Sequence, residues 1–213
     1  MSVEWCTSNA LVAYENAEVF MQQRIKAIQD KRACECVWLL EHPPLYTVGA
    51  GTIAKAHTDL IDAKRFPIHK ARRGGKYTYH GPGQRICYVM VDLGKRDKDL
   101  RHYIRALEQW GMDAFALCGV ETLRSNVGVG LWVMKDKAPQ KIAAIGVRVS
   151  QWVTSYGIAF NVSPDLDHYK GIIPCGIKDY GVTSLHALGR PLNIRTFDAY
   201  LKKAFQANSF LSL

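Results

Sequence analysis

No stretch of the 213-residue sequence is apolar enough to cross a bilayer, because charges or prolines interrupt every hydrophobic run before the roughly 18 residues that a membrane helix needs. The N-terminus also lacks a basic region followed by an apolar block. Glu4, Glu15 and Glu18 all precede the first basic residue, Arg24. This pattern argues against a secretory or mitochondrial presequence, so we expect the protein in the cytoplasm and not in a membrane.

The short motifs that bind nucleotides or catalytic zinc are also missing. The sequence has no G-x-x-x-x-G-K-[ST] loop, no G-x-G-x-x-G fingerprint and no H-E-x-x-H helix. Cys34 and Cys36 are one residue apart, too close for the usual zinc spacing, and no second Cys or His pair completes a site. We therefore expect neither a metal nor another cofactor.

Cysteine is present but does not suggest a disulfide framework. Six cysteines, at positions 6, 34, 36, 87, 118 and 175, are scattered through a mid-sized chain, and a reducing compartment would keep them as thiols.

Acidic residues are fewer than basic ones, 19 against 28, which gives a formal net charge of +9 and a pI near 9.3. Such a charge attracts nucleic acid, an anionic membrane or an acidic protein, and charge alone does not choose among them. The basic residues are dispersed, with only short clusters such as Lys70, Arg72, Arg73 and Lys76. This dispersal disfavours a nucleic-acid-binding tail.

The apolar fraction of 48% and charged fraction of 22% are ordinary for a globular chain, and we expect one domain over residues 1–213. Three- and four-residue apolar spacing predicts helices over 8–30, with Ser8 as N-cap, over 99–118 and over 196–210. Short apolar or alternating runs predict strands at 36–40, 45–49, on both sides of Gly81–Gly83, and at 127–134, 142–149 and 152–162. This order indicates an α+β fold with helices packed on a mostly antiparallel sheet.

The segment RGGKYTYHGPGQ, residues 73–84, is dominated by glycine. Its glycines allow close backbone approaches that other residues forbid, while Arg73 and His80 supply polar groups at its ends. The segment could cradle a ligand. The structural alternative is a glycine-rich hairpin with an exposed histidine, and local chemistry does not decide between the two.

A lysine enters the small and apolar strand KIAAIGVR at residue 141. Burial would lower the pKa of a lysine and a neighbouring thiolate would raise it, which suits a catalytic acid and base. The plainer alternative is a lysine at the edge of a sheet.

Cys175 stands between Pro174 and Gly176 in GIIPCGI, which we expect to form a tight turn that presents its thiol. A thiolate beside a cation is a strong nucleophile, and the adjacent glycine permits an acyl group to approach. Taken alone, Cys175 is still more often structural than catalytic. The other five cysteines lie in helical or strand-like contexts, where a thiol is usually a small hydrophobe.

Together these segments resemble the hallmark runs of the lipoyl(octanoyl) transferase family, RGG-x-x-T-[YF]-HGPGQ, KI-x-x-[IL]-G-x-R and PCG. The similarity continues, in family order, through HPPLYTVGAGT at 42–52, GLWV at 130–133 and YGIAFNV at 156–162. Lys76 and Arg85 stand where the family often has other residues, such as glutamine and leucine, and we interpret both as surface choices.

The resemblance implies the fold of the catalytic domains of biotin and lipoate protein ligases, with Cys175 and Lys141 as catalytic groups. It also implies an acyl-binding pocket made of Arg73, Gly74, Gly75, Lys76, Tyr77, Thr78, Tyr79, His80, Ala144, Ile145, Gly146, Gly157, Ile158 and Ala159.

The activity implied by the resemblance is transfer of an octanoyl or lipoyl group from acyl carrier protein, through a Cys175 thioester, to the lysine of a lipoyl domain. Such a step begins protein lipoylation, and its acceptors are lipoyl domains of 2-oxoacid dehydrogenases and the glycine cleavage H protein. A thioester is more activated than the amide formed from it, so no ATP is needed. We expect a monomer that binds no nucleic acid.

Two alternatives stay open. An ATP-dependent lipoate-protein ligase would use the same fold, and a noncatalytic binding module would keep the pocket without the chemistry. His80 orients the acyl group, steadies the site by hydrogen bonding, or acts as the general base.

Overall fold

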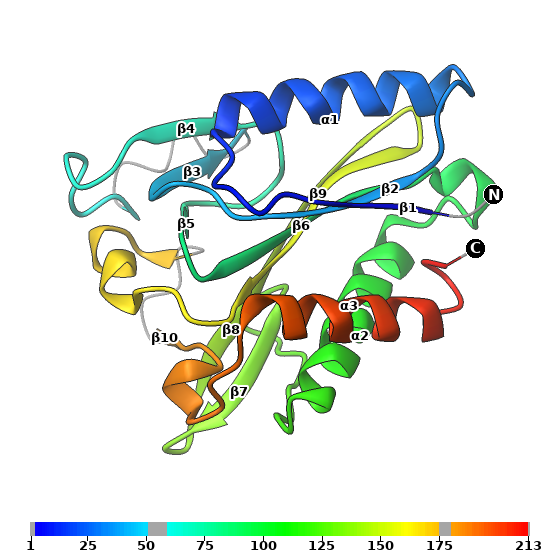
Figure 1. The fold of residues 1–213 in the computed structure, drawn as a ribbon. Helices are drawn as coiled ribbons and strands as arrows, with labels where there is room; N and C mark the ends of the chain where they lie inside the picture. Colours follow the sequence, from blue (N-terminus) through cyan, green and yellow to red (C-terminus); the bar gives the residue numbers. More distant parts are fainter. Residues whose placement is uncertain (1–2, 51–58, 175–179, 213) are drawn as a thin grey trace.

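The computed structural model describes residues 3–50, 59–174 and 180–212, and within them a large sheet separates two layers of helices. In Figure 1, α1 (Tyr14–Gln29) lies over one face of this sheet, while α2 (Leu100–Leu117) and α3 (Ile194–Ala207) lie together on the other. The first and last described residues are on the same side of the molecule.

The large sheet has the order β1 (Glu4–Thr7), β2 (Cys36–Leu40), β6 (Gln84–Met90), β9 (Val153–Asn161), β8 (Ala138–Ser150) and β10 (Gly181–Val182). A further strand, β7 (Leu131–Lys135), also pairs with β8. The pairs β2–β6, β6–β9, β8–β9 and β7–β8 are antiparallel, whereas β1–β2 and β8–β10 are parallel. The predicted α+β class with a mostly antiparallel sheet is confirmed.

A second, smaller sheet has the order β4 (Ile68–Ala71), β3 (Leu45–Gly49) and β5 (Thr78–His80). It packs against η4 (Leu166–Gly171) through a cluster that includes Tyr46, Tyr79 and Tyr169. Two further 3-10 helices are η3 (Leu93–Lys95) and η6 (His186–Leu188). The small sheet brings the glycine-rich loop, which runs from β4 into β5, against the large sheet.

Alternation along the central strands explains why both faces of the large sheet are covered. In β2, Val37 and Leu39 pack in the core beneath α2 and α3, while Trp38 and Leu40 pack in the core beneath α1. Successive side chains of a strand point to opposite faces, so an uninterrupted apolar strand needs a helical layer on each side.

The predicted helix at 8–30 exists, but its predicted start is wrong. The N-cap is Ala13, which makes no side-chain capping bond, and the helix begins at Tyr14. The Ser8 hydroxyl instead accepts a hydrogen bond from Trp38 Nε1 at 3.0 Å. The chain between Ser8 and Ala13 stays beside the end of β2, where the Ser8 N–H donates to the Leu39 carbonyl oxygen and the Val12 N–H to that of Glu41, both at 2.9 Å.

Arg85 was predicted to be a surface residue, and this is wrong. Its side chain is 2% exposed, and its guanidinium makes two parallel hydrogen bonds to Asp198 of α3, at 2.7 and 2.6 Å. The ion pair ties the last helix to the central strand β6. Lys76, in contrast, keeps 41% of its side chain exposed while it pairs with Asp59 at 3.0 Å.

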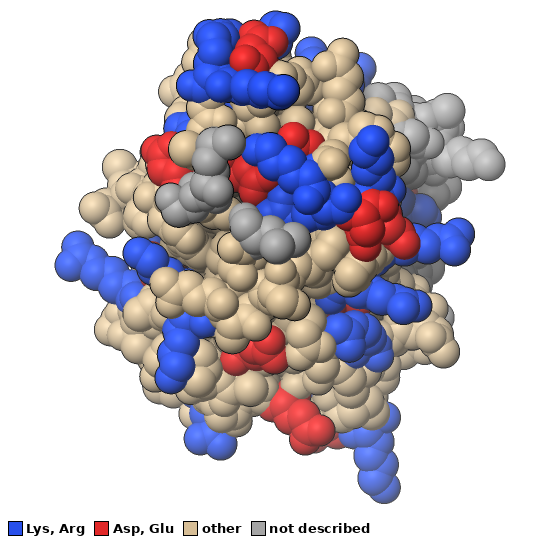
Figure 2. Space-filling view, turned by 90° about the vertical axis from the view of Figure 1, so that its right-hand side faces the viewer, with Lys and Arg blue, Asp and Glu red and all other residues tan. Residues whose placement is uncertain are grey.

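Within the described residues, no helix is both long and apolar enough to span a membrane. Figure 2 shows the face beside the chain termini, where lysines and arginines stand in separate groups with acidic and uncharged residues between them. The basic charge is therefore spread over this face, as the dispersed sequence pattern indicated.

Candidate active site

A cavity of about 260 Å³ lies on the α1 side of the large sheet, beneath the glycine-rich loop. Its lining is mostly apolar and comes from four parts of the chain. These are the start of α1, the loop at 73–80, the loop at 127–129, and the facing positions of β6, β8 and β9.

Small residues make the floor of the cavity. Ala144 pairs with Ala159, and Gly146 pairs with Gly157, across the β8–β9 ladder. A Cβ added to Gly146 would lie 2.6 Å from Arg73 Cδ, and one added to Gly157 would lie 2.4 Å from the Cys87 carbonyl oxygen. A larger side chain at Gly146 would displace Arg73 of the loop above it, and one at Gly157 would collide with the backbone of β6.

Arg73 fixes the glycine-rich loop over this floor. Its Nη1 donates to the carbonyl oxygens of Gly74 at 2.9 Å and Lys76 at 3.3 Å, and its Nη2 donates to the hydroxyl of Thr47 in β3. The residue is 8% exposed. A buried guanidinium that satisfies several carbonyl oxygens holds the backbone of an otherwise flexible segment in one shape.

His80 is buried and neutral, contrary to the alternative of an exposed hairpin histidine. Burial lowers the pKa of His80 to about 3. The Gln84 amide nitrogen donates to Asn161 Oδ1, which leaves Gln84 Oε1 to accept from His80 Nδ1 at 2.7 Å. The other ring nitrogen, Nε2, lies 3.3 Å from the Thr47 hydroxyl. A histidine in this state is a weak base and supports the loop by hydrogen bonding.

Lys141 lies inside the large sheet and not at its edge, since β8 has partners on both sides. The lysine is 6% exposed. Its Nζ donates to the Val129 carbonyl oxygen at 3.1 Å and lies 4.7 Å from the centre of the Trp132 ring. The Trp132 indole N–H in turn holds the Gly128 carbonyl oxygen at 3.0 Å. Trp132 therefore supports both the ammonium and the loop that faces it.

A buried hydrogen-bond network connects His80 to the backbone of Lys141. Beyond Gln84, the Asn161 amide nitrogen donates to the Thr183 carbonyl oxygen at 2.9 Å. The Thr183 N–H donates to the Lys141 carbonyl oxygen, also at 2.9 Å. These hydrogen bonds join β5, β6, β9 and β8 and hold the four strands relative to one another.

Cys175, the predicted nucleophile, lies outside the described residues. The chain that follows it is described from Tyr180, whose ring packs edge-on to Trp132 with centroids 6.0 Å apart. In the next two positions, β10 pairs with Gln140 and Lys141. The described residues after the PCG segment therefore lie directly against the lysine.

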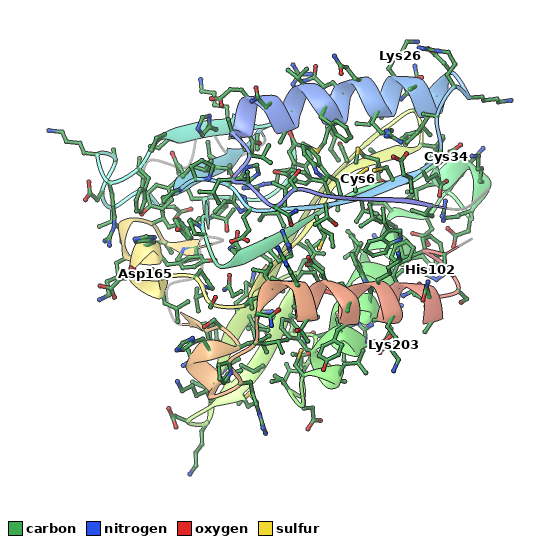
Figure 3. The ribbon with its side chains drawn as sticks, in the orientation of Figure 1. Cys6, Lys26, Cys34, His102, Asp165 and Lys203 are labelled. Atoms are coloured by element: carbon green, nitrogen blue, oxygen red, sulfur yellow. The ribbon has the colours of Figure 1, made fainter. Side chains whose placement is uncertain are left out.

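The described cysteines are free thiols: Cys6, Cys34, Cys36, Cys87 and Cys118. Figure 3 labels Cys6 and Cys34, which lie on the side of the chain termini, whereas Asp165 marks the opposite side, where η4 leads toward the PCG segment. Burial raises the pKa values of Cys6 and Cys118. For Cys6 and Cys118, this fits structural thiols and not nucleophiles.

The structure gathers most of the predicted pocket residues around the cavity. Its lining includes Arg73, Gly75, Lys76, Thr78, His80, Lys141, Ala144, Ile145, Gly146, Gly157, Ile158 and Ala159. Gly74, Tyr77 and Tyr79 do not line it. The two tyrosines pack in the core of the small sheet, and the Tyr79 hydroxyl lies 2.7 Å from His168 Nδ1. Sharing a cavity does not test a binding role, so these roles stay predictions.

Sequence reasoning missed several lining residues: Tyr14, Ile86, Tyr88, Val127, Gly128, Val129 and Tyr156. The three tyrosines come from α1, β6 and β9. Tyr156 directly precedes the predicted Gly157, so its place in YGIAFNV was the available signal. Within the described residues, no group of three or more His, Cys, Asp or Glu side chains is placed to hold a metal ion.

Comparison with known proteins identifies the family. A model for the lipoyl protein ligase A/B catalytic domain matches residues 13–206. The octanoyltransferase of Dinoroseobacter shibae is 49% identical over 213 residues, which cover 96% of this chain and 96% of that protein. The chain belongs to the octanoyltransferase family, within the lipoyl protein ligase A/B group. It is therefore an acyltransferase, as predicted.

Solved structures confirm the expected fold. The bipartite lipoate protein ligase of Thermoplasma acidophilum superposes with a TM-score of 0.72 at 13% identity, covering 98% of this chain and 84% of that one. Biotin protein ligase from Aquifex aeolicus gives a TM-score of 0.53 at 10% identity, covering 98% and 69%. At such low identity the likeness concerns the fold alone.

Proposed function

We propose that this acyltransferase moves an octanoyl or lipoyl group from acyl carrier protein to a lysine of a lipoyl domain, through a thioester on Cys175. One observation carries the proposal: an apolar cavity is lined, among its few polar groups, by the buried amine of Lys141. An acyl chain gains about 0.8 kcal/mol for each methylene that it buries, so such a cavity favours a medium-length chain.

In the first half of the reaction, the Cys175 thiolate attacks the carbonyl carbon of the carrier-bound thioester. The bond from that carbon to the phosphopantetheine sulfur breaks, and the Lys141 ammonium gives its proton to the departing sulfur. The products are the Cys175 acyl-enzyme, neutral Lys141 and the free carrier thiol. The hydrogen bond to Val129 and the contact with Trp132 support the Lys141 side chain in this role.

In the second half, the acceptor lysine amine attacks the Cys175 thioester. Its proton passes to neutral Lys141, the amide forms, and the Cys175 thiolate leaves. This restores both groups to their starting states, so one lysine serves as acid and then as base. His80 steadies the glycine-rich loop and does not exchange the proton, since its low pKa makes it a poor base.

The acceptors that we propose are lipoyl domains of 2-oxoacid dehydrogenases and the glycine cleavage H protein, served by a monomer in the cytoplasm. The net charge of +9 would speed encounter with acidic partners.

Transfer without ATP tests the proposal against a lipoate-protein ligase. Octanoyl-acyl carrier protein and a lipoyl domain are incubated with the enzyme in the absence of nucleotide, and the intact mass of the lipoyl domain is measured by mass spectrometry. A gain of one octanoyl group supports the transferase. A gain that appears only with free octanoate and ATP would identify a ligase, and none under either condition would indicate a binding module.

A further inference from the structure

A second hollow, of about 130 Å³, lies next to the acyl cavity and has a different character. It is bounded by the outer part of α1 and the ends of β8 and β9, and its lining is more polar than that of the acyl cavity, including Glu18, Gln22, Arg72 and Arg148. Among the described residues, Tyr156 is the one that borders both hollows. The Tyr156 ring is therefore a partition between an apolar and a polar space.

Tyr156 is held in this position from two sides. Its hydroxyl donates to Glu18 Oε1 of α1 at 2.7 Å and accepts from the Arg72 N–H at 2.8 Å. Its φ angle is 59°, a conformation that side chains other than Asn, Asp or Gly seldom adopt. A tyrosine stays in such a conformation when its surroundings hold it there, and these two bonds supply that constraint.

Tyr156 lies at the far end of the cavity from Lys141. On β8, Lys141 and Val147, the residue that pairs with Tyr156, are six residues apart, which corresponds to roughly 20 Å of strand. Seven carbon–carbon bonds of about 1.5 Å each span at most about 11 Å, so an octanoyl chain fits between the two ends. A longer chain that extends along β8 would reach the Tyr156 ring.

The other tyrosines at this end of the cavity have no hollow behind them. Tyr14 and Tyr88 belong to the core between α1 and the sheet, and the Tyr88 hydroxyl lies 2.8 Å from His42 Nε2. Behind Tyr156, in contrast, lies the polar hollow. Removing the Tyr156 ring is thus the change that would join the two spaces.

We infer that Tyr156 is the end wall of the acyl cavity and a specificity-determining residue that limits the length of the acyl chain. This inference rests on the proposed function, which puts the thioester at the Lys141 end and the methyl terminus at the Tyr156 end. It assigns the tail end of the cavity a role separate from the chemistry at Lys141.

The test compares acyl donors of increasing length on two variants. Tyr156→Gly removes the ring and suits the positive φ angle, whereas Tyr156→Phe keeps the ring and removes its hydroxyl. For each protein, kcat/KM is measured with octanoyl-, decanoyl- and dodecanoyl-acyl carrier protein and one lipoyl domain. We expect the dodecanoyl-to-octanoyl ratio to rise at least about tenfold in Tyr156→Gly, because the added methylenes no longer meet the ring, and to rise far less in Tyr156→Phe.

An unchanged ratio in a folded Tyr156→Gly enzyme would overturn the inference. If that variant does not fold, the same ratio in Tyr156→Asn decides, since asparagine also tolerates positive φ and is shorter than the ring. The wild-type enzyme distinguishes failure of this inference from failure of the proposed function. If the wild type transfers octanoyl and the ratio does not rise in the variants, Tyr156 is not the end wall. If the wild type transfers no acyl group from any donor, the proposed function is refuted.

Discussion

The N–H of Thr183 donates to the carbonyl oxygen of Lys141 at 2.9 Å. Through this bond and the β8–β10 pairing, the chain that follows the PCG segment is attached to the strand that carries the buried lysine. Lys141 and Cys175 are 34 positions apart in the sequence (175 minus 141). Thr183, which follows the PCG segment, is nevertheless in direct contact with Lys141. This contact supports the proposal that Lys141 and Cys175 share one site.

Replacing Lys141 should affect activity far more than replacing His80. We expect Lys141→Ala to lower octanoyl transfer by at least about 10³-fold, since it removes the proposed acid and base. His80→Ala loses loop support and should lower transfer by roughly tenfold to a hundredfold. Lys203→Ala, an exposed lysine on α3, is the control and should keep wild-type rates. Transfer rates are measured at saturating donor. A folded His80→Ala enzyme as inactive as Lys141→Ala would make His80 the base instead.

Removing one partner of the Arg85–Asp198 pair should destabilise the fold strongly, whereas replacing both with apolar residues should destabilise it little. Asp198→Ala leaves the 2%-exposed Arg85 guanidinium without its carboxylate, and we expect a loss of about 3–5 kcal/mol in the free energy of unfolding. The double variant Arg85→Leu with Asp198→Leu removes both charges and should recover most of that loss. Urea unfolding measures both. A double variant no more stable than Asp198→Ala would contradict this view of the pair.

Stability should fall as the pH drops below about 6.5. Burial lowers the pKa of His42 to about 4 and that of His80 to about 3, so the folded state stays unprotonated at both while the unfolded chain takes up protons. Each group then costs about 1.4 kcal/mol of unfolding free energy at pH 5.5, one pH unit below its ordinary pKa. Urea unfolding at pH 7.5 and 5.5 should show a smaller difference in His42→Gln than in wild type. Equal differences would refute the assignment.

Salt should slow the enzyme when substrate is scarce. The net charge of +9 attracts acidic protein substrates, and ions screen that attraction beyond about 8 Å at physiological ionic strength. We expect kcat/KM to fall between 50 and 300 mM sodium chloride while kcat changes little, because electrostatic steering speeds the encounter with substrate and not the chemical step. A kcat/KM that does not change with salt would remove steering from the account.

Much of the fold was predictable because its longer elements carry regular apolar patterns. The helix at Leu100–Leu117 and the strands around Lys141 and Gly157 fall where periodicity placed them. β1, β4 and β10 were missed, since each has two to four residues and is fixed by pairing with distant strands. Ser8 was misread as a cap because a side chain's partner, here Trp38, cannot be seen in local sequence.

In the candidate site too, residues in local motifs could be predicted, whereas those whose position depends on distant contacts could not. Lys141, His80 and the small floor residues were found because they stand in recognisable motifs. Tyr156 was not, since its role depends on a positive φ angle and on a bond to Glu18, 138 positions away. The burial of Arg85 could not be predicted from the local sequence either, because its partner Asp198 lies on the last helix.

The most direct test of the account is the intact mass of the enzyme after incubation with octanoyl-acyl carrier protein, before and after a lipoyl domain is added. The wild-type protein should gain one octanoyl group that hydroxylamine removes and that moves onto the lipoyl domain, and Cys175→Ser should gain none that hydroxylamine removes. Transfer to the lipoyl domain by a folded Cys175→Ser enzyme at the wild-type rate would contradict the proposed thioester intermediate.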